Sequence, residues 1–488
     1  MLKIAKQDLD NISEPLRYFG NEYGSIKKAE YDIKIRVALC YPNLYDIGIK
    51  NYTFLSLYNT LNKINGVYCE RCFMPFIDFE NLLKYKNIEL FSLETNTPIS
   101  KFNFVIFVLP SEIEYMNVIT MLTLSNLDKS ISKPVLIGVF DNEVSNHYPL
   151  ADILDIFVYN DYLSICKDIL FRYNVYTLQK RNSKEFLESI NTIEEVIVPS
   201  IDMDKKIKLR NDKVTNINDI SVIPVSNMSS INQSIEIYFE EDIVNLEKYT
   251  LNLIKNTGIK NIILKCNTLK YDLVYEYILN LKNVYSFLDI KIFGIPLNED
   301  TVKIYTVSKM TNNEIFIDIP TLSEKKNNFK YNEILKMLKL AFCNNVNSIC
   351  FNVIIGTDIN NFHDLEKLID FVNEVKDTFY NISSIKRKSG LNIRVNVKND
   401  FKYDIDKIEL KQRFLKENLN NIKLVFENPM LCILKNILTK EDSNLINLLT
   451  KLSENGIRVY RDKNKINNKV VLKTFEELNL DIKKYLCN

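Results

Sequence analysis

Cys69 and Cys72 form the only CxxC in the chain, within the stretch VYCERCF at 67–73. Two thiols at this spacing can bind a metal ion, bind an iron–sulfur cluster or form a redox disulfide. The aromatic and β-branched residues around them, followed by Pro75, predict an extended segment, in which residues three apart point to opposite faces. A structural zinc site also needs two further ligands, and the sequence has no second CxxC and no HxxxH. We therefore interpret the pair as partly buried free thiols.

The other residues that could bind a metal do not form a recognisable site. His147 and His363 are the only histidines, and His363 is expected to start a surface helix. Cys343 and Cys350 are separated by an expected helix-to-strand turn, so we do not expect them to share a metal. No catalytic residue and no metal ligand is therefore predicted.

Glycine content and charge exclude several kinds of function. Ten glycines occur in 488 residues, where a usage of about 7% would give roughly 34. No GxG is present and no P-loop can be written, so the standard phosphate-binding loops are excluded. Lysine and arginine total 63 against 62 for aspartate and glutamate, which leaves no excess positive charge for a phosphate backbone. Nucleic acid is therefore not an expected partner.

The N-terminal sequence MLKIAKQDLDNISEPL lacks the apolar core of a signal peptide. Apolar runs such as FVIFVLP at 104–110 are too short to span a bilayer, so no membrane partner is expected. We expect a cytoplasmic protein, whose nine scattered cysteines stay as thiols in a reducing compartment.

Short apolar runs alternate with helical patterns between residues 33 and 172. The expected strands include KIRVALCY, FVIFVL, PVLIGV and IFVYN, and the expected helices include YTFLSLYNTLNKI and SEIEYMNVITMLTLSNL. This alternation is typical of an α/β domain with a parallel sheet between helices. Residues 1–32 would then form an N-terminal extension.

A second α/β region is expected after a linker. Residues 173–232 lose the regular alternation and are interpreted as a linker region. Alternation resumes over 233–421 with SIEIYF, NIILKC, DIKIFG, EIFIDI, SICFNVII and LNIRVNV. Six consecutive β/α units predict a partial or complete barrel. Residues 422–488 contain IKLVFENP and IRVY and would form a further unit or a C-terminal extension.

Several segments resemble one known family. They are LRYFGNEYGSIKK, RVALCYPNLYDIGIKN, PLADILDIFV, NTGIKNIIL and FNVIIGTD. In these segments the chain resembles the radical S-adenosylmethionine (SAM) proteins with an N-terminal cobalamin (B12)-binding domain, in the group that opens with RYxGGEYNSxKK. The resemblance covers most of the chain. It implies a Rossmann-like B12-binding-like domain over 33–172 and a radical-SAM-like (β/α) barrel over 233–421.

The cluster motif of this family has no counterpart here. In the family, the first barrel strand leads into CxxxCxxC, whose thiolates hold a [4Fe-4S] cluster that binds SAM. The matching strand is SIEIYF, and the helical pattern EEDIVNLEKYTLNLIKNTG follows almost at once. The three cysteines would belong between Phe239 and Glu241, and no single cysteine such as Cys266 can replace them. We therefore predict a degenerate member without its own cluster.

The cobalamin site of the family is also altered. Where the family reads YEIGMSHLG, with a histidine for the cobalt, this chain reads YDIGIKNYT and has Asn51 and Thr53 instead of His and Gly. Two glycine-rich turns of the family correspond to IGVF and NDYLS. Glycines let a backbone approach a bulky ligand, and larger side chains are expected to fill that space here: Val139, Phe140 and Tyr162. No cofactor is therefore predicted.

Seven residues are candidates for a vestigial cofactor-binding pocket: Asp46, Gly48, Asn51, Gly138, Asp161, Gly356 and Asp358. Asp46 and Gly48 follow the first expected strand, where ligands bind in open α/β sheets. The alternative is that Gly48 makes the turn and Asp46 caps the next helix. Gly356 and Asp358 follow SICFNVII at the ligand-binding end of a barrel, and the alternative is a strand-ending turn.

Three functions are compatible with these features. The leading hypothesis is a degenerate family member that acts as a binding, scaffold or regulatory partner, for example of an intact radical SAM relative. The second is a metal-independent enzyme that reuses the barrel or the Rossmann-like cleft for a small molecule. The third is a remodelled nucleotide or SAM site.

Overall fold

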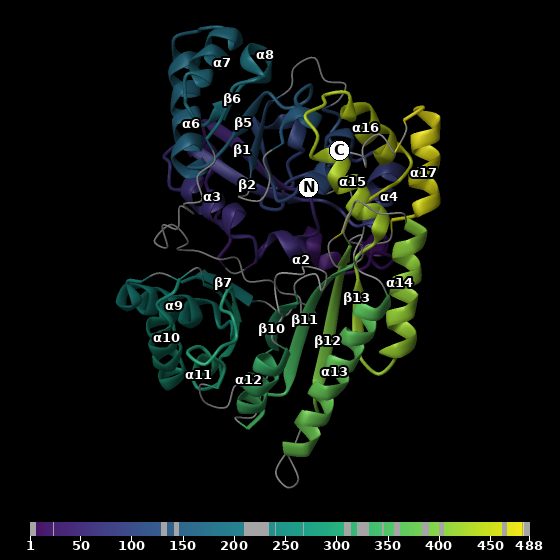
Figure 1. Ribbon diagram of the computed structural model, residues 1–488. Helices are drawn as coiled ribbons and strands as arrows, with labels where there is room; N and C mark the ends of the chain where they lie inside the picture. Colours follow the sequence, from purple (N-terminus) through teal and green to yellow (C-terminus); the bar gives the residue numbers. More distant parts are fainter. Residues whose placement is uncertain are drawn as a thin grey trace. The chain divides into compact units, whose positions relative to one another are not determined.

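Two groups of parallel strands organise the chain, each in its own unit (Figure 1). Unit 1 comprises Met1–Ile231 and Ile437–Ile482, and unit 2 comprises Asn232–Asn436 and Lys483–Asn488. None of the described helices is long and apolar enough to cross a membrane. The computed structural model describes residues 6–22, 24–127, 134–140, 146–208, 234–239, 241–266, 268–306, 314–319, 331–343, 346–355, 362–382, 390–399, 405–460, 466–480 and 482.

Unit 1 contains one sheet with the strand order β2-β1-β3-β4-β5-β6. Its ladders are parallel except that between β5 and β6. The order reverses at β1, which lies between β2 and β3, and ligands bind at such reversals in open α/β sheets. The strands are β1 (Ile35–Tyr41), β2 (Val67–Phe73), β3 (Phe104–Leu109), β4 (Val135–Phe140), β5 (Ile156–Val158) and β6 (Val196–Ile197).

The helices of unit 1 pack in two groups. Apolar residues of α3, α6 and α7 form one hydrophobic core with alternate residues of the strands. Helix α5 packs beside α4 and against α16. The longer helices are α3 (Tyr52–Asn62), α4 (Ile77–Lys86), α5 (Tyr115–Leu124), α6 (Tyr162–Leu178), α7 (Ser183–Asn191), α16 (Leu445–Glu454) and α17 (Asn468–Glu477). The short ones are α1 (Lys6–Leu9), α2 (Tyr45–Gly48) and α8 (Pro199–Asp202).

The region interpreted as a linker contains regular structure in its described part. The boundary at 172 lies inside α6, and residues 173–208 include the rest of that helix together with α7, β6 and α8. Helix α7 has few apolar residues, of which Phe186 and Ile190 are buried in the core. The helix has only nine residues and three apolar ones, Phe186, Leu187 and Ile190, so it did not continue the longer apolar runs seen before residue 172.

A buried ion network at the carboxyl end of β2 connects three segments of unit 1. The fully buried Arg71 pairs with Glu94 (Nε to Oε1, 2.5 Å) and with Glu22 (Nη2 to Oε2, 2.8 Å). The Tyr45 hydroxyl donates to Glu22 Oε1 at 2.8 Å. Burial raises the pKa of Glu94. Burial alone would also raise the pKa of Glu22, but the charge and hydrogen bonds of Arg71 outweigh it and lower that pKa.

The N-terminal segment LRYFGNEYGSIKK packs against the unit 1 sheet, with Arg17 and Gly20 near the carboxyl end of the strands and Lys28 at the amino end of β2. Arg17 Nε donates to both carboxylate oxygens of Asp46 at 3.1 Å. Gly20 has a φ of +61°, and a Cβ at this position would lie 2.3 Å from the carbonyl oxygen of Leu93, so a larger residue does not fit. Lys28 donates to main-chain carbonyls in the connection from α3 to β2. The described motif residues therefore have structural contacts.

The C-terminal part of unit 1 is held by polar contacts with α4 and α5. Arg458 donates to both oxygens of the Glu80 carboxylate, at 2.9 and 2.6 Å. The Asn117 amide donates to the carbonyl of Val459 at 2.7 Å and accepts from its N–H at 3.2 Å. The segment IRVY, which was assigned to a further unit or a C-terminal extension, forms no strand in the described structure, and the Asn117 side chain takes both backbone hydrogen bonds of Val459.

Unit 2 contains two sheets whose described ladders are all parallel. Their strand orders follow the chain: β7-β8-β9 and β10-β11-β12-β13. The strands are β7 (Ser234–Tyr238), β8 (Asn261–Lys265), β9 (Asp289–Phe293), β10 (Glu314–Ile319), β11 (Ser348–Ile355), β12 (Asn392–Asn399) and β13 (Lys423–Phe426). Each of the strands expected in this region is present. In the described part of the chain no ladder joins β9 to β10, so a closed barrel stays a prediction.

Helices follow the strands of unit 2 in the expected β/α alternation. Apolar residues of the strands pack on them, as where Phe351 of β11 contacts Phe371 of α13 with ring centroids 5.6 Å apart. The helices are α9 (Ile243–Thr257), α10 (Tyr271–Val284), α11 (Val302–Thr306), α12 (Tyr331–Cys343), α13 (Phe362–Ile382), α14 (Ile405–Asn418) and α15 (Pro429–Leu438).

The substitution Arg71→Met should destabilise the protein by about 3–5 kcal/mol, because it leaves two buried carboxylates without their cation. Urea unfolding followed by circular dichroism measures this change. Lys184→Met is the matched control, since the exposed Lys184–Glu188 pair, 4.0 Å apart, should contribute less than about 1 kcal/mol. Equal effects of the two substitutions would contradict a central role of the Arg71 network.

The pair between Glu80 and Arg458 should make stability depend on pH. Burial alone would raise the pKa of Glu80, but Arg458 and Lys84 lower it below its ordinary value of 4.5. A carboxyl with a lowered folded-state pKa adds stability above its unfolded pKa and loses it as the pH falls through the folded value. The difference in unfolding free energy between wild type and Glu80→Gln should therefore shrink from about pH 5 to pH 3. A difference that stays constant over this range would refute the assignment.

Candidate functional site

Two of the predicted pocket residues at the carboxyl end of β1 have packing partners. The Asp46 carboxylate forms an ion pair with the Arg17 guanidinium. Gly48 lies against aromatic rings, since a Cβ at this position would be 2.5 Å from the ring of Phe73 and 2.7 Å from that of Tyr41. The absence of a side chain at Gly48 therefore allows close packing of these rings.

Two further predicted residues cap helices. Asn51 Oδ1 accepts the backbone N–H of Phe54 at 2.9 Å and begins α3, and Asp161 Oδ1 accepts that of Ser164 at 3.3 Å and begins α6. The side chain of Asn51, which the resemblance predicts to replace a cobalt-binding histidine, is therefore directed to the backbone of its own helix.

Gly138 on β4 is enclosed by apolar side chains. A Cβ at this position would lie 3.0–3.1 Å from Leu109, Leu154 and Phe157. Phe140 stacks on Phe157 with ring centroids 5.6 Å apart. The three side chains that were expected to fill the space for a ligand are all buried: Val139, Phe140 and Tyr162.

The remaining two candidates, Gly356 and Asp358, lie outside the described residues. His363 is exposed in the first turn of α13, as expected, with Nδ1 3.6 Å from the Glu366 carboxylate. The structure therefore does not gather the described candidates into one pocket.

The two thiols of the CxxC lie on opposite faces of β2. Cys69 belongs to the hydrophobic core shared with α3 and α6, whereas Cys72 is paired in register with Cys40. All three are buried free thiols, and burial raises the pKa values of Cys40 and Cys69 well above their usual range. Buried neutral thiols are poor nucleophiles and poor metal ligands. Within the described ranges no group of three or more His, Cys, Asp or Glu residues could hold a metal ion.

The junction where the resemblance predicts a cluster loop does not have the ligands for a cluster. Strand β7 ends at Tyr238 and α9 begins at Ile243, with Asp242 capping the helix through the N–H of Asn245 at 3.3 Å. The intervening sequence FEED contains no cysteine. Cys266 follows the next strand, and burial raises its pKa to about 12. One such thiol cannot replace three ligands from a single loop.

Unit 2 has a polar face that we did not predict. On β10 the residues Ile315, Ile317 and Ile319 are buried, whereas Glu314 and Asp318 lie on the opposite face. Strands β11 and β12 alternate in the same way, with Cys350, Asn352, Arg394 and Asn396 on the polar face. Parallel strands usually read as continuous apolar runs because both faces are covered. Alternation in EIFIDI and NIRVNV was therefore the signal in the sequence for this face.

Hydrogen bonds connect the polar residues across the strands in two rows. Near the carboxyl ends, Asn352 Nδ2 donates to Asp318 Oδ1 at 2.8 Å, and Asn396 Nδ2 donates to Asn352 Oδ1 at 2.9 Å. Nearer the amino ends, Arg394 Nη2 pairs with Glu314 Oε2 at 2.5 Å. The arginine charge is thus neutralised within the sheet, whereas the Asp318 carboxylate accepts, among the described side chains, the amide of Asn352.

A cavity of about 430 Å³ opens beside Asp318, toward the carboxyl ends of β9, β10 and β11. Its polar side chains are Asp318 and Asn352, and the Tyr305 hydroxyl is bonded to the Ile295 carbonyl at 2.6 Å. The turn after β9 requires Gly294, whose φ is +85°, since a Cβ would lie 2.0 Å from the Cys266 carbonyl oxygen. The apolar and aromatic lining comes from Ile292, Phe293, Ile295, Pro296, Leu297, Phe316, Ile317 and Ile334. Parallel α/β units bind ligands at this end.

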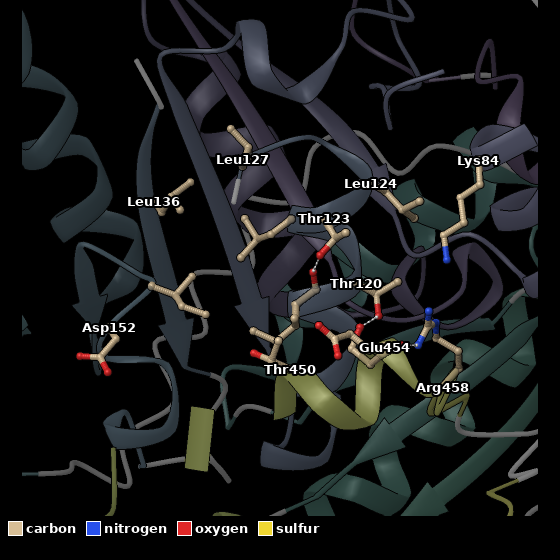
Figure 2. Close-up of a pocket in the computed structure, with 14 residues that line it drawn as sticks. Lys84, Thr120, Thr123, Leu124, Leu127, Leu136, Asp152, Thr450, Glu454 and Arg458 are labelled. Carbon is tan, nitrogen blue, oxygen red and sulfur yellow. Dashed lines mark hydrogen bonds between the residues drawn. The ribbon is translucent and has the colours of Figure 1, made fainter. Parts of the chain in front are cut away.

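Unit 1 has a larger cavity of about 640 Å³, lined by α5, α16 and the start of β4 (Figure 2). Leu127 and Leu136 give it apolar walls, and Thr120 bonds to Ser453 at 2.8 Å. It lies at the amino end of β4, away from the strand ends that usually hold ligands, and the side chain of Arg458 is already engaged.

A third cavity, of about 480 Å³, contains His147. Both ring nitrogens are engaged, Nδ1 with the Tyr159 hydroxyl at 2.9 Å and Nε2 with the Met203 carbonyl at 2.8 Å. Burial lowers the pKa of His147 despite these contacts. The cavity of unit 2 is therefore the best candidate site, since a carboxylate faces an aromatic pocket there.

Comparison with known proteins gives one match. Residues 53–199 match the family described as radical SAM proteins, N-terminal, and this segment runs from α3 to α8 in unit 1. The match covers less than half of the chain. No curated protein matches the sequence. The matched segment is thus similar to the N-terminal region of radical SAM proteins, within a mixed α/β chain that has parallel sheets.

Proposed function

We propose that this chain is a degenerate member of the B12-binding-domain radical SAM group, with a Rossmann-like first domain and a partial barrel, and that it acts by binding. The observation that carries this proposal is the junction between β7 and α9, where four residues without a cysteine connect strand to helix. Radical chemistry in this family needs a cluster in that loop, so the chain does not supply it alone.

We also propose that this chain does not bind cobalamin, and the carboxyl end of the unit 1 sheet supports this. A corrinoid needs open space at the strand ends and an axial ligand for its cobalt. Here Asn51 caps α3, and Asp46 forms an ion pair with Arg17. Gly138 is enclosed by the side chains of Leu109, Leu154 and Phe157. Side chains of the protein occupy the positions that the cofactor would need.

A protein with this framework and no cofactors needs a partner or a ligand. An intact radical SAM relative is the partner that the degenerate-member hypothesis favours, and a complex on co-expression with such a relative from the same genome would support it. The alternative is a small-molecule binder or metal-independent enzyme, and the cavity beside Asp318 specifically favours it. Both functions are compatible with a chain that carries no cluster.

Cofactor analysis tests the proposal directly. Protein purified without oxygen, and then reconstituted with iron and sulfide, should contain far less than one cluster and one corrinoid per chain. Metal and acid-labile sulfide assays and the visible spectrum measure both. Cys266→Ser is the matched control and should leave the traces of iron unchanged, since Cys266 is buried. A stoichiometric cluster or bound cobalamin would overturn the proposal.

The packing role of Gly48 gives an independent test of the filled strand ends. Gly48→Ala should lower the free energy of unfolding by about 1–3 kcal/mol, because the new methyl group would overlap the rings of Phe73 and Tyr41. Gly390→Ala is the control, since no atom lies within 4 Å of a Cβ there. Chemical denaturation of both variants provides the comparison. An unchanged midpoint for Gly48→Ala would mean that this region has room for a ligand.

A further inference from the structure

We propose that the cavity of unit 2 binds a small organic ammonium ion with an aromatic or apolar body. This inference rests on the alternative function proposed above, that of a small-molecule site. It assigns the chemical class of the ligand from the charge and shape of the cavity.

Asp318 provides the charge. It is the only acidic or basic residue among the described lining residues, and Tyr305, the other titratable one, is bonded to a carbonyl. Asp318 Oδ1 accepts the amide of Asn352, whose own oxygen accepts the amide of Asn396. This relay fixes the orientation of the carboxylate. No described residue donates to Oδ2, so the second oxygen is available to a ligand.

The nearby cations do not neutralise Asp318. Arg394 is directed to Glu314, two residues before Asp318 on the same face of β10. Lys398 lies on β12, which is separated from β10 by β11, so its backbone is about 10 Å away. Lys265 on β8 has an interaction of its own. The charge in the cavity is therefore negative, which favours a cation and disfavours an anion.

The walls of the cavity determine the rest of the ligand. Phe293 and Phe316 lie with ring centroids 4.4 Å apart, next to Asp318, and Ile292 and Pro296 extend the apolar surface. Aromatic faces attract an ammonium group by cation–π interaction, and apolar walls gain by burying a hydrocarbon body. A volume of about 430 Å³ is in the range of small-molecule sites.

Three probes that differ in charge test the assignment: phenethylammonium, phenethyl alcohol and phenylacetate. With the full-length protein near neutral pH, phenethylammonium should bind about tenfold more tightly than the alcohol, because it adds a charged hydrogen bond. Phenylacetate should bind most weakly. Ligand-observed NMR titration measures the three affinities, and added salt should reduce the advantage of the ammonium probe.

Variants connect this preference to Asp318. Asp318→Asn should reduce ammonium affinity to that of the alcohol and leave the alcohol unchanged, and Asn396→Ala should reduce ammonium affinity less. Asp300→Asn is the matched control, because Asp300 is an exposed carboxylate of unit 2 outside the cavity lining. Phe316→Leu should weaken both probes, and the ammonium probe more, because that probe also loses a cation–π interaction. Circular dichroism and thermal melting verify that each variant is folded.

The outcomes separate this inference from the proposed function. Equal binding of ammonium and alcohol, or an ammonium preference that persists in folded Asp318→Asn, would overturn the ammonium assignment and leave a small-molecule site in place. No saturable binding of any probe would overturn both the assignment and the small-molecule function. Neither result affects the cofactor analysis, which tests the degenerate-member proposal separately.

Discussion

The buried charge of Arg71 is the interaction on which the architecture of unit 1 depends. A guanidinium without solvent needs carboxylates around it, and these come from the N-terminal segment and from the loop after α4. Glu22 is in turn bonded to Tyr45, which begins the short helix after β1. One cation therefore determines how three segments meet at the carboxyl end of the sheet.

This arrangement is compatible with the proposed loss of a cofactor site from a retained framework. The motif residues Arg17, Gly20, Glu22 and Lys28 contact protein atoms, so their presence follows from folding. The candidate cofactor positions, in contrast, contain caps and packed rings. Resemblance at the motif residues is informative about architecture. Chemistry depends on the candidate cofactor positions and on the loop after β7.

The sequence predicted the strands well because each one is a short apolar run between turn residues, as in KIRVALCY and SICFNVII. It missed α7, whose apolar residues are few, and it could not pair Arg71 with Glu22, since 49 residues separate them. The row of Asp318, Asn352 and Asn396 was missed for the same reason, because only the strand register places these side chains side by side. The sign of this row in the sequence was the alternation of apolar and polar residues in EIFIDI and NIRVNV.

The contact between Arg458 and Glu80 joins residues 378 positions apart within unit 1, because residues 232–436 of unit 2 are inserted in its sequence. During synthesis, residues 232–436 of unit 2 are made before the segment of unit 1 that contains α16, so α5 lacks this partner until then. The surface of α5 that α16 covers contains leucine and isoleucine side chains, and it lacks this cover in that interval. The helix that completes this part of unit 1 is thus made late, although the first strand of the unit is made early.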